Sequence, residues 1–371
     1  MVGNDMEKVK TGIIGCGMIS EIYIKNTSSI YQNLEVVAVA DIDIERAKAR
    51  AEQFNISKAY LPEELLADDE VEMVINLTIP VAHAPVTLKA LEAGKHVFVE
   101  KPLAIKREEG LKILEVAKEK GLYVGCAPDT FLGGGLQTCR KLIDDGWIGE
   151  PLGATAFMLG SGPEGFHPNP DFFYVEGGGP MFDMGPYYLT ALVHLLGPIK
   201  RVTGSTKATY SERTIGSGPR KGQKVPVEIP THISGVFDFE SGAVGSIITS
   251  FDVWGSQLPR IEIYGTNGTL IVPDPNTFGG PIYIKRPGDP DWSSVPLIYG
   301  FTENSRGIGA ADMANAIRTG GENRASGKLA FHVLDVMHAF QDSSDAGAHI
   351  TITSGCERPE PLPMNQYRLF E

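Results

Sequence analysis

Cysteine, long apolar runs and concentrated positive charge are all scarce in this sequence. Its four cysteines are scattered, with no Cys-x-x-Cys spacing and no neighbouring histidines, so we expect no metal site and no disulfide framework. No segment approaches the roughly 18 apolar residues of a membrane span, and the opening MVGNDMEKVK is too polar for a signal peptide. The sequence therefore predicts a cytoplasmic protein without a membrane partner.

Positive charge is outweighed by negative charge, since 33 Lys and Arg stand against 46 Asp and Glu, for a net charge of −13. Such a field repels nucleic-acid phosphates and anionic lipids. The densest basic cluster, Arg220, Lys221 and Lys224, lies in a Gly-, Pro- and Ser-rich stretch and is expected to be a solvated loop. We expect no nucleic-acid partner, which leaves an acidic enzyme or a binder of small molecules.

With 371 residues, of which 42% are hydrophobic, the chain is long enough for two domains. Up to residue 126, short apolar runs alternate with amphipathic segments, the rhythm of a doubly wound parallel α/β sheet. We expect a doubly wound domain over residues 1–127. Its strands are predicted at Thr11–Ile14, Glu35–Ala40, Val71–Leu77, His96–Val99 and Leu122–Cys126, and its helices at Asp43–Phe54, Ala82–Ala93 and Arg107–Lys120.

After Ala127, alternating strands follow one another without intervening helices. This predicts an α+β domain with a large, open, mostly antiparallel sheet over residues 128–345, and a tail over 346–371 associated with it. Ser211–Pro226 has no periodicity and is expected to be a loop or a lid. The expected strands are Arg201–Thr209, His232–Phe239, Ala243–Phe251, Arg260–Tyr264 and Thr269–Val272, and the helices lie near Leu136–Asp145 and at Pro186–Leu196, Gly309–Arg318 and Lys328–Gln341.

An open antiparallel sheet has two faces to cover. Helices cover one of them, so the strands between residues 232 and 272 offer the other to a second subunit. The sequence therefore predicts a homodimer or homotetramer that assembles through this sheet.

A glycine motif follows the first predicted strand and opens a helix: Gly15-Cys-Gly17-Met18-Ile19-Ser20. The first glycine makes the tight turn, the second lets the backbone approach a pyrophosphate, and a small residue in the third position lets helix pack on strand. The motif is weak evidence alone, but its place between strand and helix is the one that dinucleotide binding requires. We therefore expect residues 1–127 to form a Rossmann dinucleotide-binding domain.

Asp41 ends the second predicted strand, 24 residues beyond Gly17. A carboxylate at this offset accepts hydrogen bonds from a ribose 2′-hydroxyl and repels a 2′-phosphate, so we expect NAD as cofactor in preference to NADP. The alternative is that Asp41 caps the next helix, a position that Asp43 is equally able to fill.

The fifth predicted strand runs directly into Glu100-Lys101-Pro102. Carboxyl ends of strands in an open α/β sheet face the ligand crevice, which directs Lys101 toward the cofactor. A lysine there can bind a substrate hydroxyl, and desolvation of a lysine lowers its pKa and makes it usable in proton transfer. The alternative is a surface lysine paired with Glu100.

Together with Gly15, Gly17 and Asp41, the string Ala90-Leu-Glu-Ala-Gly-Lys-His-Val-Phe-Val-Glu-Lys-Pro-Leu-Ala resembles the Gfo/Idh/MocA family of NAD(P)-dependent oxidoreductases, which includes glucose-fructose oxidoreductase and inositol dehydrogenase. The resemblance extends through Gly177-Gly-Gly-Pro-Met-Phe-Asp-Met-Gly-Pro-Tyr187 and Asn323-Arg-Ala-Ser-Gly to the final helix.

The resemblance implies a role for each matching residue. Lys101 is expected to be a hydroxyl-binding proton relay, with Glu100 beside it at the cofactor, and Asp183 is expected to orient the substrate. For Asp183, a carboxylate that caps the following helix is the alternative. The family's turn after the fourth strand, which lines the cofactor, corresponds here to Thr78, Pro80 and His83.

Two positions depart from the family pattern. Val81 stands where the family often has asparagine, and Tyr187 stands where it usually has histidine, four residues after Asp183. With an ordinary pKa of about 10, a tyrosine is a weaker base than histidine, but a neighbouring lysine cation favours its phenolate. Either Tyr187 or His167, in Phe-His-Pro-Asn-Pro, is therefore expected to accept the proton and contact the substrate.

Asp129, Thr130 and Phe131 follow the last strand of the first domain, where the family is richer in Asn and Arg. At the carboxyl end of a strand, the two polar side chains are suited to sugar hydroxyls and the ring to a stacking platform. A capped turn after Pro128 is the alternative.

These residues favour a dehydrogenase that moves a hydride between NAD and a secondary hydroxyl of a sugar, polyol or glycoside. Two alternatives remain. One is a non-catalytic NAD-binding regulator, and the other is a redox-neutral glycoside hydrolase that uses NAD for transient oxidation.

Overall fold

The computed structural model describes residues 7–365 and 370, which divide into two compact units. Unit 1 contains residues 7–133, 299–331, 359–365 and 370, and unit 2 contains residues 134–298 and 332–358. The final long helix, α9 (Gly327–Ala346), contributes its first residues to unit 1 and the rest to unit 2. In the described part of the chain, no helix is both long enough and apolar enough to cross a membrane.

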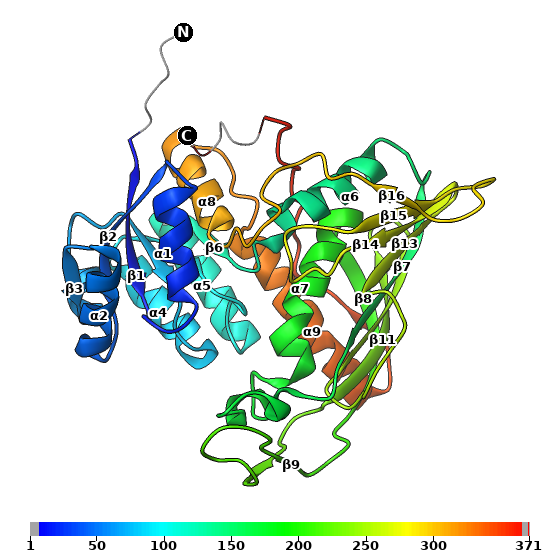
Figure 1. Ribbon diagram of the computed structural model, residues 1–371, viewed down its shortest axis with the longest axis horizontal. Helices are drawn as coiled ribbons and strands as arrows, with labels where there is room; N and C mark the ends of the chain where they lie inside the picture. Colours follow the sequence, from blue (N-terminus) through cyan, green and yellow to red (C-terminus); the bar gives the residue numbers. More distant parts are fainter. Residues whose placement is uncertain (1–6, 366–369, 371) are drawn as a thin grey trace. The chain divides into compact units, whose positions relative to one another are not determined.

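Unit 1 is built on a six-stranded sheet in the order β3-β2-β1-β4-β5-β6, with every neighbouring pair parallel (Figure 1). This strand order is that of a Rossmann fold, so the predicted doubly wound sheet is confirmed. The strands are β1 (Val9–Ile14), β2 (Leu34–Ala40), β3 (Lys58–Tyr60), β4 (Met73–Asn76), β5 (His96–Val99) and β6 (Val124–Cys126). The helices between them are α1 (Ser20–Ser29), α2 (Ile44–Phe54), α3 (Pro62–Leu66), α4 (Pro80–Glu92) and α5 (Arg107–Lys120).

The ends of these helices follow from their sequences. Asp43 caps α2, its side chain accepting a hydrogen bond from the Glu45 amide, and Asn55 ends the helix in the left-handed conformation at φ 55°. Gly121 ends α5 in the same way, at φ 67°. Since Asp43 occupies the cap, Asp41 is left for another role.

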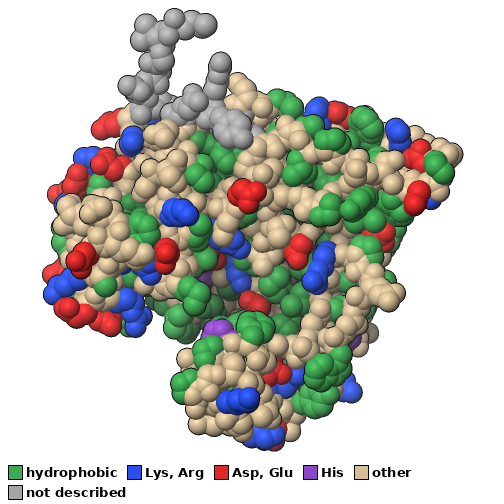
Figure 2. Space-filling view, in the orientation of Figure 1, with side chains coloured by type: hydrophobic (Ala, Val, Ile, Leu, Met, Phe, Trp, Pro, Cys, Tyr) green, Lys and Arg blue, Asp and Glu red, His purple; other side chains and the backbone are tan. Residues whose placement is uncertain are grey.

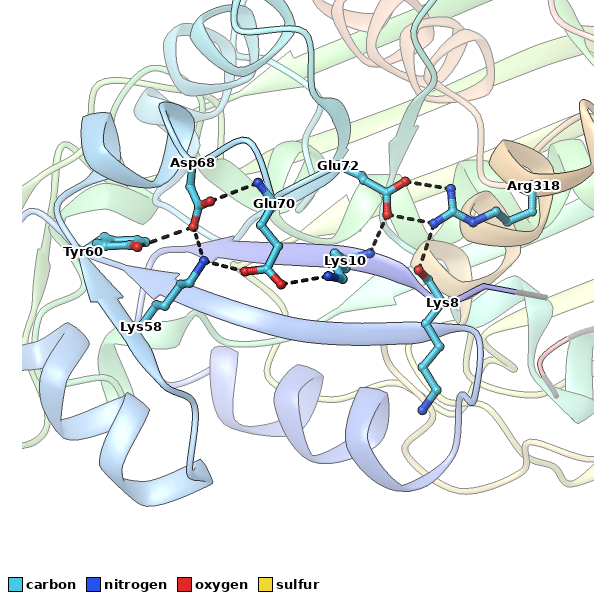
Figure 3. A network of polar contacts seen from close by, with 8 residues as sticks. All are labelled: Lys8, Lys10, Lys58, Tyr60, Asp68, Glu70, Glu72 and Arg318. Atoms are coloured by element: carbon cyan, nitrogen blue, oxygen red, sulfur yellow. Dashed lines mark hydrogen bonds and ion pairs between the residues drawn. The ribbon is translucent and has the colours of Figure 1, made fainter. Parts of the chain in front are cut away.

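Unit 1 also contains segments from the C-terminal part of the chain. The expected first domain, in contrast, ends at residue 127. Helix α8 (Ile308–Thr319) belongs to unit 1, because the Arg318 guanidinium pairs with both carboxylate oxygens of Glu72 at 2.7 Å and donates to the carbonyl oxygen of Lys8 at 2.8 Å (Figure 3). Phe370 also belongs to it, since its buried ring lies edge-on to Tyr31 at 5.6 Å. The tail is thus not attached to the second unit alone.

Unit 2 is built on a nine-stranded sheet in the order β16-β15-β14-β13-β7-β12-β11-β8-β17. All neighbouring pairs are antiparallel except β7 with β12, which confirms a large, mostly antiparallel sheet. Helices α6 (Gly134–Asp144) and α7 (Gly179–Leu196) pack on one face. The strands are β7 (Pro151–Leu159), β8 (Ile199–Lys207), β11 (His232–Phe239), β12 (Val244–Ser250), β13 (Ile261–Gly265), β14 (Gly268–Val272), β15 (Ile282–Lys285), β16 (Ser293–Val295) and β17 (Ile350–Thr351).

Two expectations for unit 2 are wrong. The segment 211–226 contains an antiparallel pair, β9 (Glu212–Thr214) and β10 (Lys224–Pro226), which strands of three residues are too short to reveal as periodicity. Helix α7 begins at Gly179, about two turns before the expected start at Pro186, because Pro180 already occupies the favoured first-turn position. Asp183 therefore lies inside the helix and does not cap it.

Candidate active site

The glycine turn after β1 has the geometry that a dinucleotide needs. Gly15 adopts φ 103°, and a Cβ there would lie 2.6 Å from the carbonyl oxygen of Leu77, so only glycine is tolerated. A Cβ on Gly17 would meet no heavy atom within 4 Å, which leaves its backbone open to a ligand. Ser20, the small third residue, is buried and donates from its hydroxyl to the carbonyl oxygen of Gly17 at 2.7 Å.

Asp41 lies directly after β2 and next to this turn. Its two carboxylate oxygens accept separate backbone hydrogen bonds, from the Cys16 amide at 2.9 Å and from the Asp43 amide at 3.0 Å. The side chain is only 6% exposed, so its direction is fixed. Burial, with the charge of Asp41 as a second cause, raises the pKa of the Cys16 thiol to about 11, which keeps that thiol protonated beside the carboxylate.

Exposed apolar side chains surround the carboxyl ends of these strands. Met18, after β1, is 93% exposed, and Ile42, after β2, is 87% exposed. After β4, Ile79 and Val81 are 66% and 64% exposed. Large apolar side chains gathered at one sheet edge are suited to flat rings, such as those of a dinucleotide. Ile42 and Ile79 were not predicted, and only their position after a buried strand indicates them in the sequence.

The turn after β4 is held by buried polar groups. The side-chain oxygen of Asn76 accepts from the Thr78 hydroxyl at 2.7 Å, and its side-chain nitrogen donates to the backbone carbonyl oxygen of His83 at 3.0 Å. The ring nitrogens of His83 lie 2.7 Å from the carbonyl oxygen of Pro102 and 3.0 Å from that of Thr78. His83 is 1% exposed and connects two turns at the carboxyl edge of the sheet, and burial lowers its pKa. Its predicted place in the cofactor site remains a prediction. Thr78 and Pro80 remain half-exposed.

Lys101 begins the turn after β5, at the same carboxyl edge as Gly15 and Asp41. The Glu100 carboxylate accepts from the Lys101 backbone amide at 3.0 Å and from the Tyr23 hydroxyl at 2.8 Å. Tyr23 is fully buried in α1, and burial raises its pKa, so it stays a neutral donor. Glu100 therefore fixes the backbone of Lys101, a role that sequence reasoning missed because Tyr23 lies 77 residues away.

The three residues predicted to contact sugar are buried: Asp129, Thr130 and Phe131. All three are at most 2% exposed. Asp129 accepts hydrogen bonds from the amides of Gly307 at 2.8 Å and Gly309 at 3.1 Å, at the start of α8. Burial raises the pKa of its carboxyl to about 6, against the effect of these amides. Asp129 thus has a structural role in unit 1 that the sequence did not reveal, and the sugar contacts of these three residues remain a prediction.

Asp183 and Tyr187 lie four residues apart in α7 and hence on one face of that helix. Asp183 is half-exposed, whereas Tyr187 is 8% exposed. The Asp183 side chain is thus more exposed to solvent than that of Tyr187.

His167 lies in the loop before α7. Its Nδ1 accepts a hydrogen bond from the Asn169 amide at 3.2 Å. The proton of the neutral ring then lies on Nε2, which acts as a donor.

Comparison with protein families identifies both units. The model of an oxidoreductase family with an NAD-binding Rossmann fold matches residues 9–127, and that of the Gfo/Idh/MocA C-terminal domain matches residues 136–271. The chain belongs to the Gfo/Idh/MocA family. It is therefore an oxidoreductase with an NAD-binding Rossmann domain, and the resemblance noted in the sequence is confirmed.

Relatives of this Gfo/Idh/MocA protein include several dehydrogenases. An uncharacterized oxidoreductase of Schizosaccharomyces pombe is 26% identical and covers 94% of this chain and 100% of its own. The scyllo-inositol 2-dehydrogenase (NAD(+)) of Bacillus subtilis is 28% identical over 71% of this chain and 74% of its own. Inositol 2-dehydrogenase of Salmonella typhimurium is 35% identical, but over only 39% of this chain and 44% of its own.

Solved structures share the fold across the whole chain. Levoglucosan dehydrogenase in complex with NADH superposes with a TM-score of 0.82 at 21% identity, covering 94% of this chain and 100% of its own. An NAD-binding oxidoreductase from Klebsiella pneumoniae gives the same TM-score of 0.82 at 22% identity. These likenesses establish the architecture of this chain.

Proposed function

We propose that this protein is an NAD-dependent dehydrogenase that oxidises a secondary hydroxyl of a sugar, polyol or glycoside. The observation that carries the proposal is the common edge of unit 1. Gly15, Gly17, Asp41 and Lys101 all follow strands of one parallel sheet at their carboxyl ends. The named relatives that act on inositols support the reaction class.

The residues present fit a dinucleotide. The open backbone at Gly17 and the start of α1 would hold its phosphates, and the Asp41 carboxylate would hold a ribose hydroxyl. When bound, the nicotinamide supplies the hydride acceptor.

In this reaction the protein binds the alcohol and removes the proton of its hydroxyl group. The Lys101 amine, fixed by the turn that Glu100 holds, accepts the hydroxyl proton as the carbon–oxygen bond becomes a carbonyl. The resulting ammonium returns this proton to solvent. The family resemblance supports a part for Asp183 and Tyr187 in orienting the substrate and in proton transfer. The helix face that these two residues share supports their joint role.

A substrate panel tests the proposal. The protein is incubated with NAD and with sugars, polyols and glycosides, and NADH fluorescence is followed. Signal with one stereochemical set identifies a dehydrogenase and the hydroxyl that it oxidises. Silence across the panel, with NAD binding intact by titration, would instead support a regulator or a redox-neutral hydrolase.

The preference for NAD over NADP is proposed from Asp41. Replacing Asp41 with alanine is expected to raise the NAD dissociation constant about tenfold, because a charged acceptor is lost. Affinity for NADP should rise at the same time, since Arg46, with a guanidinium nitrogen 3.9 Å from Asp41, would be released to a 2′-phosphate. Fluorescence titration with both reduced cofactors measures the ratio.

Glu45→Ala is the matched control for Asp41→Ala. Glu45 lies four residues away in the first turn of α2 and pairs with Lys48 at 2.8 Å, so its loss should leave the cofactor preference unchanged. Unchanged affinities of Asp41→Ala for both cofactors would rule out the ribose contact.

We further propose that a second copy of this chain covers the outer face of the unit 2 sheet. On that face, Val236 of β11 and Val244 of β12 are 47% and 52% exposed. Trp254 and Leu258, between β12 and β13, are 91% and 53% exposed. Such apolar exposure is typical of a surface that another subunit buries.

Sedimentation velocity over a micromolar dilution series tests this assembly. A dimer or tetramer is expected, and Val236→Lys should shift it toward monomer because an ammonium would be buried. Leu111→Lys, at a 48% exposed position of α5 in unit 1, should leave the assembly unchanged. A monomer throughout the series would overturn the proposal.

A further inference from the structure

The hydroxyl of Tyr23 is a buried hydrogen-bond donor next to the Lys101 turn. Tyr23 lies in α1, three residues after the start of that helix, and its side chain is fully buried. Its hydroxyl donates to one carboxylate oxygen of Glu100 at 2.8 Å, and the other oxygen accepts from the Lys101 backbone amide at 3.0 Å. Each oxygen of Glu100 thus has a donor, and neither of these two donors is the Lys101 ammonium.

Helix α1 is fixed on both sides of Tyr23. At its start, the Ser20 hydroxyl donates to the carbonyl oxygen of Gly17 at 2.7 Å, which joins the helix to the glycine turn. One turn after Tyr23, the side-chain nitrogen of Asn26 donates to the carbonyl oxygens of residues 304 and 306, at 2.8 and 2.9 Å. The helix whose first turn would hold the cofactor phosphates therefore also sets the position of the Tyr23 hydroxyl.

Other titratable and charged groups of unit 1 lie around Tyr23 and Glu100. They are His83, Lys101, Cys126, Asp129 and Arg306. Burial raises the pKa of Tyr23 and of the Cys126 thiol and lowers that of His83, so these three side chains are neutral at pH 7. The cations of this group are Lys101 and Arg306, and Lys101 is the one whose backbone Glu100 binds.

The burial of Tyr23 distinguishes this hydrogen bond from contacts at the surface. Figure 2 shows Lys, Arg, Asp and Glu side chains interspersed over the surface of unit 1 around α2. Water can replace a lost partner of such exposed groups, and salt screens their charges. A water molecule has little room to replace the Tyr23 hydroxyl, because the side chain is fully enclosed.

We propose that Tyr23 is a positioning residue for Lys101, which by binding one oxygen of Glu100 limits the attraction of that carboxylate for the Lys101 ammonium. The proposal rests on the proposed proton transfer at Lys101 and adds a residue to it. A carboxylate that loses a hydrogen-bond donor attracts a neighbouring cation more strongly. An ammonium that is attracted in this way keeps its proton to higher pH. With Tyr23 in place, Lys101 becomes a base at a lower pH than it would without that donor.

Tyr23→Phe tests the proposal, because it removes the hydroxyl and keeps the ring. We expect the pH midpoint at which kcat rises to its plateau to increase by about one unit. Below both midpoints, kcat should be about tenfold lower than in the unmodified protein, whereas on the plateau the two proteins should agree within about twofold. A merely structural role of Tyr23 would lower kcat by the same factor at every pH.

Tyr31→Phe is the matched control for Tyr23→Phe. Tyr31 is also a buried tyrosine of unit 1, and its hydroxyl donates to the backbone carbonyl oxygen of Ser305. Its loss should lower the melting temperature, since a buried acceptor loses its donor. The pH midpoint of kcat should not change in Tyr31→Phe.

Glu100→Gln separates the charge of Glu100 from its contacts. A tyrosine hydroxyl can accept as well as donate, so a glutamine can keep both contacts while the negative charge is lost. The pH midpoint of kcat should then fall, because the carboxylate no longer stabilises the Lys101 ammonium. Adding Tyr23→Phe to Glu100→Gln should cause no further change of the midpoint. An unchanged midpoint in Glu100→Gln would overturn the proposal even if Tyr23→Phe does not fold.

Titration of Lys101 without substrate separates this proposal from the proposed function. Lysine amines are labelled with isotope-enriched methyl groups and followed by NMR, and the Lys101 signal is assigned by its absence in Lys101→Arg. A titration midpoint that rises in Tyr23→Phe, without turnover of any substrate, overturns the dehydrogenase and keeps the role of Tyr23. Turnover with the same midpoint in Tyr23→Phe and in the unmodified protein overturns the role of Tyr23 alone.

Discussion

Replacing Lys101 with alanine is expected to lower kcat by about three orders of magnitude, because the group that takes the hydroxyl proton is lost. The dissociation constant of NAD should stay within about twofold, since a side chain that serves proton transfer contributes little to cofactor affinity. Lys101→Arg should be almost as inactive, because a guanidinium remains protonated and cannot accept a proton. Stopped-flow kinetics with the best substrate of the panel, beside an NADH titration, provide both values.

Lys106→Ala is the matched control for Lys101→Ala. Lys106 lies five residues further on, is exposed, and contributes its backbone amide to the start of α5. Neither kcat nor the dissociation constant of NAD should change in Lys106→Ala. If Lys101→Ala instead loses NAD with kcat preserved, the lysine belongs to the cofactor site and the proton relay is wrong.

Replacing Arg324 with alanine is expected to destabilise the protein by about 3 kcal/mol, because it leaves a buried carboxylate without its partner. Asp312, in α8, is 1% exposed and accepts from the Arg324 backbone amide at 2.6 Å as well as pairing with its guanidinium. Thermal unfolding followed by circular dichroism measures the loss. Lys112→Ala, which breaks an exposed pair with Glu115, should leave the melting temperature unchanged.

The pH dependence of Arg324→Ala provides a second readout. Burial raises the pKa of Asp312 above its ordinary value of 3.8, and removal of Arg324 raises it further. The native state then binds a proton at a higher pH than the unfolded state does, so lowering the pH toward 4 should stabilise the variant relative to the unmodified protein. A melting-temperature difference that is the same at pH 5 and pH 8 would contradict a buried, uncompensated charge.

The parallel sheet and its glycine turn could be predicted because local sequence determines both. The apolar runs that end at Ile14 and Ala40 are buried strands as expected, and Gly15 is the residue that the turn requires. The choice between Asp41 and Asp43 also follows from local rules, since a helix needs one cap and Asp43 supplies it. These features depend on neighbours within a few residues.

The errors lie where distant segments decide the outcome. Strand β7 was missed because its small residues Gly153, Ala154 and Ala156 give no strong alternation. It is a strand because it pairs with β12 and β13, about 90 to 110 residues later in the chain. The bonds that Asp129 accepts from the amides of residues 307 and 309 were missed for the same reason. No spacing rule connects positions so far apart.

Unit 1 is discontinuous, and this has a consequence for the order in which the chain can fold during synthesis. Three of its structural supports come late: the Arg318 pair with Glu72, the α8 amides that satisfy Asp129, and the Phe370 ring on Tyr31. A nascent chain that has emerged only to residue 133 carries the whole parallel sheet but lacks the α8 amides, the Arg318 pair and the Phe370 ring that complete unit 1. Unit 2, whose main segment is synthesised in between, is thus complete in most of its sheet before the nucleotide-binding unit can close.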